Sequence, residues 1–235
     1  EIHERLVGSE MCIRDRFMAV DFRDEAPAIL KDYLIYKQTI KNMSKKTIDE
    51  YFIDLRTFFR FLKVMRGLAP DGTEFDEIKI DDVDLDLIKT VNLELAYDYM
   101  NFLYRDRNNK SASRARKCSS LKGFFKYITN NKHLLDTNPV EQLESPKNKK
   151  ALPKYLTLEQ SIELLNAVDG NNKQRDYCIL TLFLNCGLRV SEMAGLNYND
   201  IHSDGTMRVV GKGNKERIVY LNLSLIHISE PTRRS

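Results

Sequence analysis

Two short stretches decide the fold of this chain: GLRVSEMAGL at residues 187–196 and VVGKGNKERIVYL at residues 209–221. An apolar run precedes Gly187, and a glycine at that point predicts a helix that ends in a left-handed residue. Arg189 follows this helix end directly. In the second stretch, alternating apolar residues flank a Lys212-Gly213-Asn214 turn, which predicts a β-hairpin. The chain therefore carries an arginine at a helix end and a lysine in a hairpin turn.

Both basic residues suit a phosphate ligand, and both also suit a structural role. The planar guanidinium of Arg189 can bind two phosphate oxygens, and Glu192 could orient it through an ion pair. The same pair could instead only hold a loop in place. Lys212 could donate a proton to a departing alkoxide, or it could be an ordinary solvated turn residue. A Walker A loop and a dinucleotide-binding loop are excluded, because a strand follows Lys212 and the third fingerprint glycine is missing.

The N-terminal part of the chain predicts four helices around one core. Apolar residues recur every three or four positions in four segments, near residues 26–41, 48–62, 93–104 and 113–128. This spacing is typical of amphipathic helices. Ser44 is the expected N-cap of the second helix, and Gly67 with Pro70 is its expected end. The acidic stretch at residues 71–86 is expected to be mostly loop.

A basic linker and a second domain are expected after these helices. Prolines and lysines make residues 135–156 an extended, solvated segment. The sequence from Thr157 to Gln160 is a capping box, which predicts a helix start. Residues 173–186 are nearly all apolar after Asp176, which predicts a central helix. The predicted fold class is therefore mainly α with a small antiparallel β-hairpin.

In this order, the motifs closely resemble those of the bacterial and phage tyrosine recombinases, including the Xer group. Further upstream, SKKT at residues 44–47 and SRARKCSSLKGFF at residues 113–125 resemble that family's helical DNA-binding domain. The resemblance implies an N-terminal four-helix, SAM-like core-binding domain at residues 24–134. It also implies the N-terminal part of an α+β catalytic domain at residues 157–222.

The resemblance further implies site-specific DNA recombination or integration without a metal or other cofactor. In this family a tyrosine hydroxyl attacks a DNA phosphodiester, which leaves a 3′-phosphotyrosyl bond and a free 5′-hydroxyl. Arg189 matches the family's first arginine, and Lys212 matches its hairpin lysine, so both are the candidate catalytic residues. The H-x-x-R element and the nucleophilic tyrosine are expected beyond Asn222, since Tyr220 occupies a strand position. The chain as written is therefore expected not to cleave DNA.

The expected partner is double-stranded DNA, bound by the full-length protein as a homotetramer. Charge supports this, because residues 71–98 hold ten acids against two bases, whereas residues 110–154 hold eleven bases against three acids. Lys45 and Thr47 lie at a helix start that suits phosphate, and one side of the fourth helix carries further basic candidates. The candidate DNA-binding residues are Lys45, Thr47, Arg114, Lys117 and Lys122.

Plainer interpretations stay open at this point. These basic residues could form an ordinary solvated helix face. The whole protein could also be a non-catalytic DNA-binding protein that kept the recombinase fold, or a helical interaction module with no nucleic-acid partner. Binding that weakens steeply with salt would eliminate the last of these.

Both ends of the sequence are interpreted as translated sequencing adapter and are set aside as non-native. The codons GAG ATG TGT ATA AGA GAC AG encode residues 10–16, and their reverse complement encodes residues 223–229. Two unrelated natural termini would not match in this way. Residues 1–16 and 223–235 therefore carry no fold prediction.

Metal binding, membrane insertion and secretion are not expected. Cys118, Cys178 and Cys186 form no CxxC pair, and His133 and His202 are isolated, so no metal site is predicted. No apolar run approaches the roughly 20 residues of a membrane span. Without the adapter residues no targeting peptide is visible, so a cytoplasmic location is expected.

Overall fold

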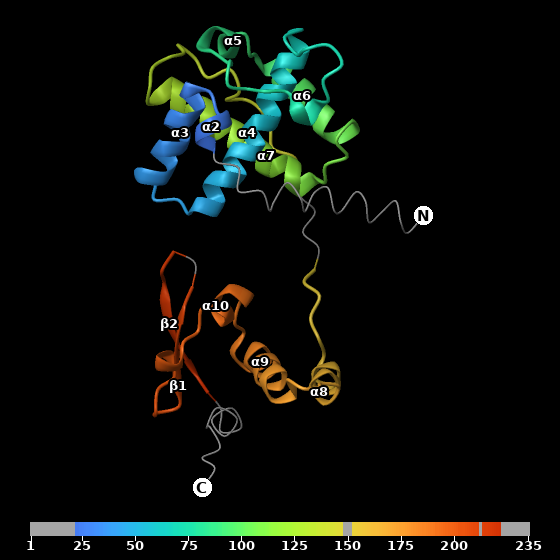
Figure 1. The fold of residues 1–235 in the computed structure, drawn as a ribbon, viewed down its shortest axis with the longest axis vertical. Helices are drawn as coiled ribbons and strands as arrows, with labels where there is room; N and C mark the ends of the chain where they lie inside the picture. Colours follow the sequence, from blue (N-terminus) through green and yellow to red (C-terminus); the bar gives the residue numbers. More distant parts are fainter. Residues whose placement is uncertain (1–21, 148–151, 212, 222–235) are drawn as a thin grey trace. The chain divides into compact units, whose positions relative to one another are not determined.

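The computed structural model describes residues 22–147, 152–211 and 213–221, and the chain divides into two compact units between residues 150 and 151 (Figure 1). The first unit is helical, and the second combines helices with a two-stranded antiparallel sheet. The predicted fold class is confirmed. None of the described helices is long and apolar enough to cross a membrane.

The first unit follows the predicted helical pattern closely. Its described helical segments are α2 (Phe22–Glu25), α3 (Ala28–Thr39), α4 (Lys45–Met65), the 3₁₀ helix η1 (Phe75–Glu77), α5 (Leu85–Lys89), α6 (Leu93–Arg105) and α7 (Ser111–Asn130). The long helices α3, α4, α6 and α7 coincide with the four amphipathic segments. The acidic stretch between α4 and α6 is loop except for η1 and α5, which agrees with the prediction.

Helix α4 begins and ends where local sequence chemistry places its limits. Ser44 has an extended backbone, and its hydroxyl oxygen accepts the Thr47 amide hydrogen at 3.4 Å. This bond satisfies one of the amide groups that a helix start leaves unpaired. After Met65, Gly67 adopts a left-handed φ of 66°, which a residue with a Cβ rarely does.

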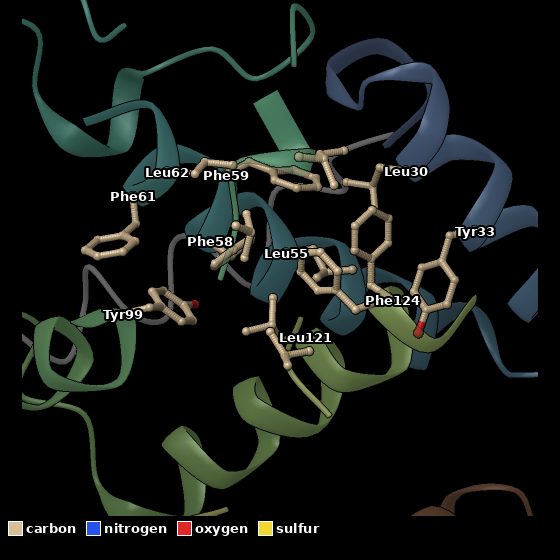
Figure 2. Packing of buried hydrophobic residues seen from close by; sticks show 14 of the residues in the cluster. Leu30, Tyr33, Leu55, Phe58, Phe59, Phe61, Leu62, Tyr99, Leu121 and Phe124 are labelled. Carbon is tan, nitrogen blue, oxygen red and sulfur yellow. The ribbon is translucent and has the colours of Figure 1, made fainter. Parts of the chain in front are cut away.

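Aromatic rings from several helices pack edge to face in the core of the first unit (Figure 2). Phe124 of α7 meets Phe59 of α4 with ring centroids 5.5 Å apart at 81°, and it meets Tyr33 of α3 with the same values. Phe58 of α4 meets Tyr99 of α6 at 5.1 Å and 77°. Such pairs add about 0.5–1.5 kcal/mol each beyond the burial of their area. They fix α4 against α7, the two helices that carry the candidate DNA contacts.

The core of the first unit extends past α7 into the segment predicted as linker. Val140 and Leu143 are buried in this core, although the sequence predicts a linker from residue 135. The Asn138 side-chain oxygen accepts the Val140 amide hydrogen at 3.1 Å and holds the turn. The linker prediction is wrong for this part, because two isolated apolar residues among polar ones form no periodic pattern.

The second unit consists of short helices beside a hairpin. Its described elements are α8 (Leu158–Asn166), α9 (Lys173–Cys186), α10 (Val190–Ala194), the 3₁₀ helix η2 (Tyr198–Asp200), β1 (Thr206–Val210) and β2 (Glu216–Tyr220). The predicted capping box is present, with bonds in both directions between Thr157 and Gln160. The small core joins α9 to the hairpin through Leu182, Leu188, Met207, Val209 and Leu221.

Helix α9 is less buried than its composition predicts. Among its described residues only Thr181 and Leu182 are buried, so the prediction of a central helix is wrong for this structure. Composition reports how apolar a helix is, whereas burial depends on what the rest of the fold places against it. The end of α9 does agree, because Gly187 adopts the left-handed values φ 57° and ψ 37°.

Candidate functional site

The candidate catalytic arginine lies at the junction between α9 and α10. Gly187 ends α9 in the left-handed region, and Arg189 is the N-cap of α10 with an extended backbone at φ −80° and ψ 153°. This sharp change of direction places Arg189 at the start of a new helix with its side chain 69% exposed. An exposed guanidinium on a well-defined backbone can meet a ligand at little conformational cost.

The Glu192 carboxylate binds both the backbone amide and the side chain of Arg189. The Arg189 amide donates to Glu192 Oε2 at 2.9 Å, and Arg189 Nη1 donates to Oε1 at 2.7 Å. The Glu192 side chain is only 2% exposed. The predicted pairing of Arg189 with Glu192 is therefore confirmed, and it is made by a buried carboxylate.

A second arginine, which the sequence analysis did not single out, shares the same carboxylate. Arg217 on β2 donates from Nη1 to Glu192 Oε1 at 2.8 Å and from Nη2 to Oε2 at 2.9 Å. This bidentate geometry is the strong form of an arginine–carboxylate pair. The bonds from Arg217 and from the Arg189 amide hold the pKa of Glu192 well below its usual range, so this carboxyl group stays ionised. We name these three side chains, Arg189, Glu192 and Arg217, the arginine–glutamate cluster.

The hairpin passes directly against this cluster at Gly211. A Cβ at Gly211 would lie 3.1 Å from Glu192 Oε1 and 3.9 Å from Arg189 Nη1. The Gly211 amide also donates to the Lys215 carbonyl at 2.7 Å, which closes the turn. A glycine is therefore what permits the hairpin to approach the carboxylate. Lys212, the candidate catalytic lysine, follows Gly211 directly and itself lies outside the described residues.

Another ion pair on the hairpin stands apart from the arginine–glutamate cluster. Arg208 of β1 donates from Nη2 to Asp200 Oδ1 at 2.8 Å, and Asp200 in turn accepts the Asn197 amide at 2.9 Å. These contacts fasten η2 to the strand. Tyr220 lies in β2 opposite Thr206 and is largely exposed.

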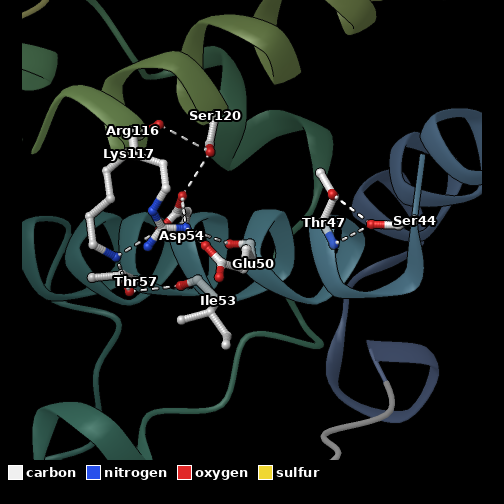
Figure 3. Close-up of polar contacts among 9 residues, drawn as sticks. All are labelled: Ser44, Thr47, Glu50, Ile53, Asp54, Thr57, Arg116, Lys117 and Ser120. Atoms are coloured by element: carbon white, nitrogen blue, oxygen red, sulfur yellow. Dashed lines mark hydrogen bonds and ion pairs between the residues drawn. The ribbon is translucent and has the colours of Figure 1, made fainter. Parts of the chain in front are cut away.

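On the first unit, two predicted DNA contacts lie in the first turn of α4. Lys45 is exposed, and the Thr47 hydroxyl lies 2.9 Å from the Ser44 hydroxyl (Figure 3). The free amide groups of a helix start and a lysine beside them favour an anion at this point.

Lys117 is placed differently from the other predicted contacts. It is buried, and its ammonium donates to Asp54 Oδ1 at 3.1 Å and to the Thr57 hydroxyl at 3.3 Å (Figure 3). Burial lowers the pKa of Lys117, while attraction to Asp54 partly opposes this effect. Helical spacing alone could not reveal this, because the partner carboxylate lies 63 residues earlier in the chain. The side chain joins α7 to α4 and is not presented to solvent.

Arg114 and Lys122 lie half-buried on α7. The Arg114 guanidinium stacks 4.7 Å from the ring centroid of Tyr104, a cation–π contact that restricts its orientation. Lys122 donates from its ammonium to the Leu143 carbonyl at 3.0 Å. These contacts fix the positions of both side chains, and the Lys122 ammonium already donates to one protein acceptor.

Arg116 is the basic residue of α7 that the sequence analysis missed. It is 44% exposed and donates from Nη1 to Asp54 Oδ2 at 2.8 Å, with Glu50 Oε2 at 2.9 Å as a second partner. Ser120 donates to the same Asp54 oxygen at 2.8 Å. Arg116, Glu50 and Ser120, but not Asp54, border a hollow of about 310 Å³ between the two helices, which is lined by Lys46, Thr47, Glu50, Tyr51, Arg116, Ser119 and Ser120.

Metal ligands do not gather in the described parts of either unit. There, no three His, Cys, Asp or Glu side chains lie close enough to hold an ion.

Two family models match the chain. The model for the phage integrase N-terminal SAM-like domain matches residues 30–132, and the model for the phage integrase family matches residues 154–233. The first match covers the helical unit that carries Lys45 and Arg116. The second covers the arginine–glutamate cluster and the hairpin.

Curated relatives and solved structures agree with these matches. The chain is 50% identical over 200 residues to "Tyrosine recombinase XerC" of Caldanaerobacter subterraneus subsp. tengcongensis, which covers 85% of this chain and 56% of that protein. It resembles the solved XerH site-specific recombinase bound to difH substrate, with a TM-score of 0.56, 18% identity, and 91% and 58% of the two chains covered. A lambda integrase tetramer bound to a Holliday junction gives a TM-score of 0.55 at 16% identity, with 96% and 63% covered.

The chain thus spans little more than half the length of the curated relative, while both of its units match models of one family. The order of those units, a SAM-like helical unit followed by a unit with the helix-end arginine and the hairpin, is the order of the two models. On these grounds the chain belongs to the phage integrase family, that of the tyrosine recombinases.

Proposed function

We propose that this chain is part of a site-specific DNA recombinase that cuts and rejoins DNA through a 3′-phosphotyrosyl intermediate. The observation that carries the proposal is the exposed Arg189 guanidinium, fixed on buried Glu192 with Gly211 of the hairpin against it. This geometry supports a role for Arg189 in binding a phosphate beside the turn whose sequence includes Lys212. Family membership supplies the reaction, which acts on a phosphate group.

In this proposal each site residue has one chemical role. The tyrosine oxygen bonds to phosphorus while the bond from phosphorus to the 5′-oxygen breaks. Arg189 binds the nonbridging oxygens, whose negative charge grows in the transition state. Lys212 gives a proton to the departing 5′-oxygen, and the phenol proton passes to a base. We assign the tyrosine to no residue of this chain, and we propose that the chain as given forms no DNA adduct.

The first unit is proposed to bind the DNA backbone through the start of α4 and one side of α7. Lys45, Thr47, Arg114 and Lys122 remain the proposed contacts, and Arg116 joins them because its guanidinium borders the hollow. Lys117 acts on this surface indirectly, by neutralising buried Asp54. Such contacts position the protein on the duplex and carry no sequence information by themselves. We propose a homotetramer on DNA, supported by the fold shared with the lambda integrase tetramer, and a cytoplasmic location.

A duplex-binding titration at several salt concentrations tests the DNA partner. The logarithm of the association constant should fall with the logarithm of salt by about 0.9 for each phosphate contacted. Lys45→Ala should weaken binding and reduce this slope by about one contact, whereas Lys89→Ala, on the acidic stretch, should do neither. Salt-independent binding, or equal effects of the two variants, would contradict a DNA-binding surface at α4.

A nicked suicide duplex tests the catalytic part of the proposal. The chain as given should form no covalent adduct, and a chain extended along the gene past Asn222 should form one. The extension should contain H-x-x-R followed by a tyrosine, and changing that tyrosine to phenylalanine should abolish the adduct. A gene that ends near Asn222 would instead favour a DNA-binding protein without catalysis.

A further inference from the structure

Arg217 has a role that the Arg189 and Lys212 pair does not explain. Both terminal nitrogens of its side chain donate hydrogen bonds to Glu192, a carboxylate that already accepts two hydrogen bonds from Arg189. A single guanidinium would be enough to neutralise that carboxylate. The second one therefore changes the net charge of the cluster.

The charges of the three side chains can be added directly. Arg189 and Glu192 alone would form a neutral ion pair, in which the carboxylate cancels the attraction of the arginine for an anion. With Arg217 the cluster carries one net positive charge. The more exposed member is Arg189, at 69% against 38% for Arg217, so this charge is presented to solvent mainly by Arg189.

The hydrogen bonds of the two arginines to Glu192 differ in the same sense as their exposure. Arg217 occupies both carboxylate oxygens from the hairpin side, whereas the Arg189 side chain uses only Nη1. A carboxylate that is already paired by Arg217 can orient Arg189 without neutralising it. We propose that Arg217 is a positioning residue that offsets the charge of Glu192 and so keeps Arg189 available to bind a phosphate. This inference rests on the proposed function only in taking the ligand to be a phosphate group.

The test is a titration of the full chain with inorganic phosphate at constant ionic strength, followed through the NMR amide signals of Arg189 and Gly211. Arg217→Gln should weaken phosphate binding by roughly three- to tenfold, the effect of one unit charge about 7 Å away at an effective dielectric constant of about 35 to 70, between that of a protein surface and that of bulk water. Arg217→Lys keeps the charge but not the bidentate geometry, so it should retain most of the affinity. Arg189→Gln should abolish the local shifts.

A double variant separates the charge effect from mere damage to the fold. In the double variant Arg217→Gln with Glu192→Gln, the carboxylate charge is also removed, so the cluster again carries one net positive charge. Phosphate affinity should therefore return to within about twofold of the parent chain. If Arg217 only fastened the hairpin, removing its partner as well would restore nothing. The matched control is Arg208→Gln, which removes a hairpin arginine paired with Asp200 and should leave the affinity unchanged.

Three results would overturn the inference: no phosphate shifts at Arg189 in the parent chain, unchanged affinity in Arg217→Gln, or a double variant as weak as Arg217→Gln alone. Duplex binding by the same samples keeps the two proposals apart. A chain that shows the charge effect but binds no duplex contradicts the proposed function only. A chain that binds duplex but whose phosphate affinity ignores Arg217 contradicts this inference only.

Discussion

Replacing Asp54 by alanine should destabilise the first unit strongly. The Asp54 side chain is 0% exposed and accepts hydrogen bonds from Arg116, Lys117 and Ser120 of α7 (Figure 3). Arg116 can turn to solvent once its partner is lost, but Lys117, at 9% exposed, cannot do so without moving α7. Leaving one charge buried and unpaired costs about 3–5 kcal/mol, and we expect a loss near 3 kcal/mol because Thr57 still binds Lys117.

Two further variants isolate the cause of that loss. Adding Lys117→Met to Asp54→Ala removes the unpaired charge and should recover at least half of the lost stability, because well-packed apolar replacements of buried ion pairs are often neutral. Glu50→Ala is the matched control, since this carboxylate also contacts Arg116 but is partly exposed. Its loss should stay below about 1 kcal/mol.

The assay is urea unfolding of the full chain, with NMR amide signals of α4 and α7 reporting the first unit separately from the second. A stability loss in Asp54→Ala no larger than in Glu50→Ala would refute the assignment of Asp54 as the buried anchor. So would a double variant in which the losses simply add, because the two side chains would then be energetically independent.

The pH dependence of the same variant gives an independent check. Burial lowers the pKa of Lys117, and attraction to Asp54 opposes this. A lysine with a lower pKa in the folded state binds fewer protons when folded, so stability rises with pH between its folded and unfolded values. Removing Asp54 lowers the folded pKa further and widens this window. The deficit of Asp54→Ala should therefore shrink as pH rises from about 7 towards about 10.

Three other changes test core packing and site electrostatics. Tyr33→Phe should be neutral or stabilise by up to about 1 kcal/mol in thermal unfolding, because the buried hydroxyl has no hydrogen-bond partner among the described residues. Gly123→Ala should lower the free energy of unfolding by about 1–3 kcal/mol, since its Cβ would lie 2.7 Å from the Tyr33 hydroxyl. Most of this loss should be absent when Gly123→Ala is made in the Tyr33→Phe background, which a double-mutant cycle measures. Because Arg217 and the Arg189 amide hold the pKa of Glu192 below its usual range, their stabilisation should be complete above the unfolded pKa of about 4.3 and should be lost progressively as pH falls below it, until pH reaches the lower folded pKa. NMR titration of the Glu192 carboxyl should show its pKa rising in Arg217→Gln, and an unchanged value would contradict the assigned contact.

Local chemistry explains why so many elements could be predicted from the sequence. Helix limits depend on residues within one turn, so Ser44, Thr157 and Gly187 predict their ends correctly. The hairpin follows from alternation and turn residues in one short stretch. The pairing of Arg189 with Glu192 spans three positions on one short helix, which sequence spacing can also express.

Contacts between distant residues explain what the sequence did not predict. Lys117 is buried because Asp54 stands opposite it across 63 residues, and no periodic pattern on α7 contains that information. Arg217 meets Glu192 across 25 residues, through a strand register that places it beside the start of α10. The predictable clue in each case was a charged residue at an otherwise apolar position, such as Asp54 between Phe52 and Leu55 on α4.

The two proposed phosphate-facing surfaces share one feature, a buried carboxylate bound by two basic side chains. Asp54 accepts hydrogen bonds from Arg116 and Lys117 of α7. Glu192 accepts hydrogen bonds from Arg189, at the start of its own helix, and from Arg217 of β2. The more buried base, Lys117 or Arg217, offsets the carboxylate charge. The more exposed arginine, Arg116 or Arg189, is then oriented by that carboxylate. The group of Arg189, Glu192 and Arg217 stays positive, whereas Glu50 also pairs with Arg116 and brings the group around Asp54 to zero net charge. An arginine held by a carboxylate alone would be well oriented but neutralised, and an arginine without one would be charged but mobile. A second base removes this conflict, because orientation and net charge then depend on different residues.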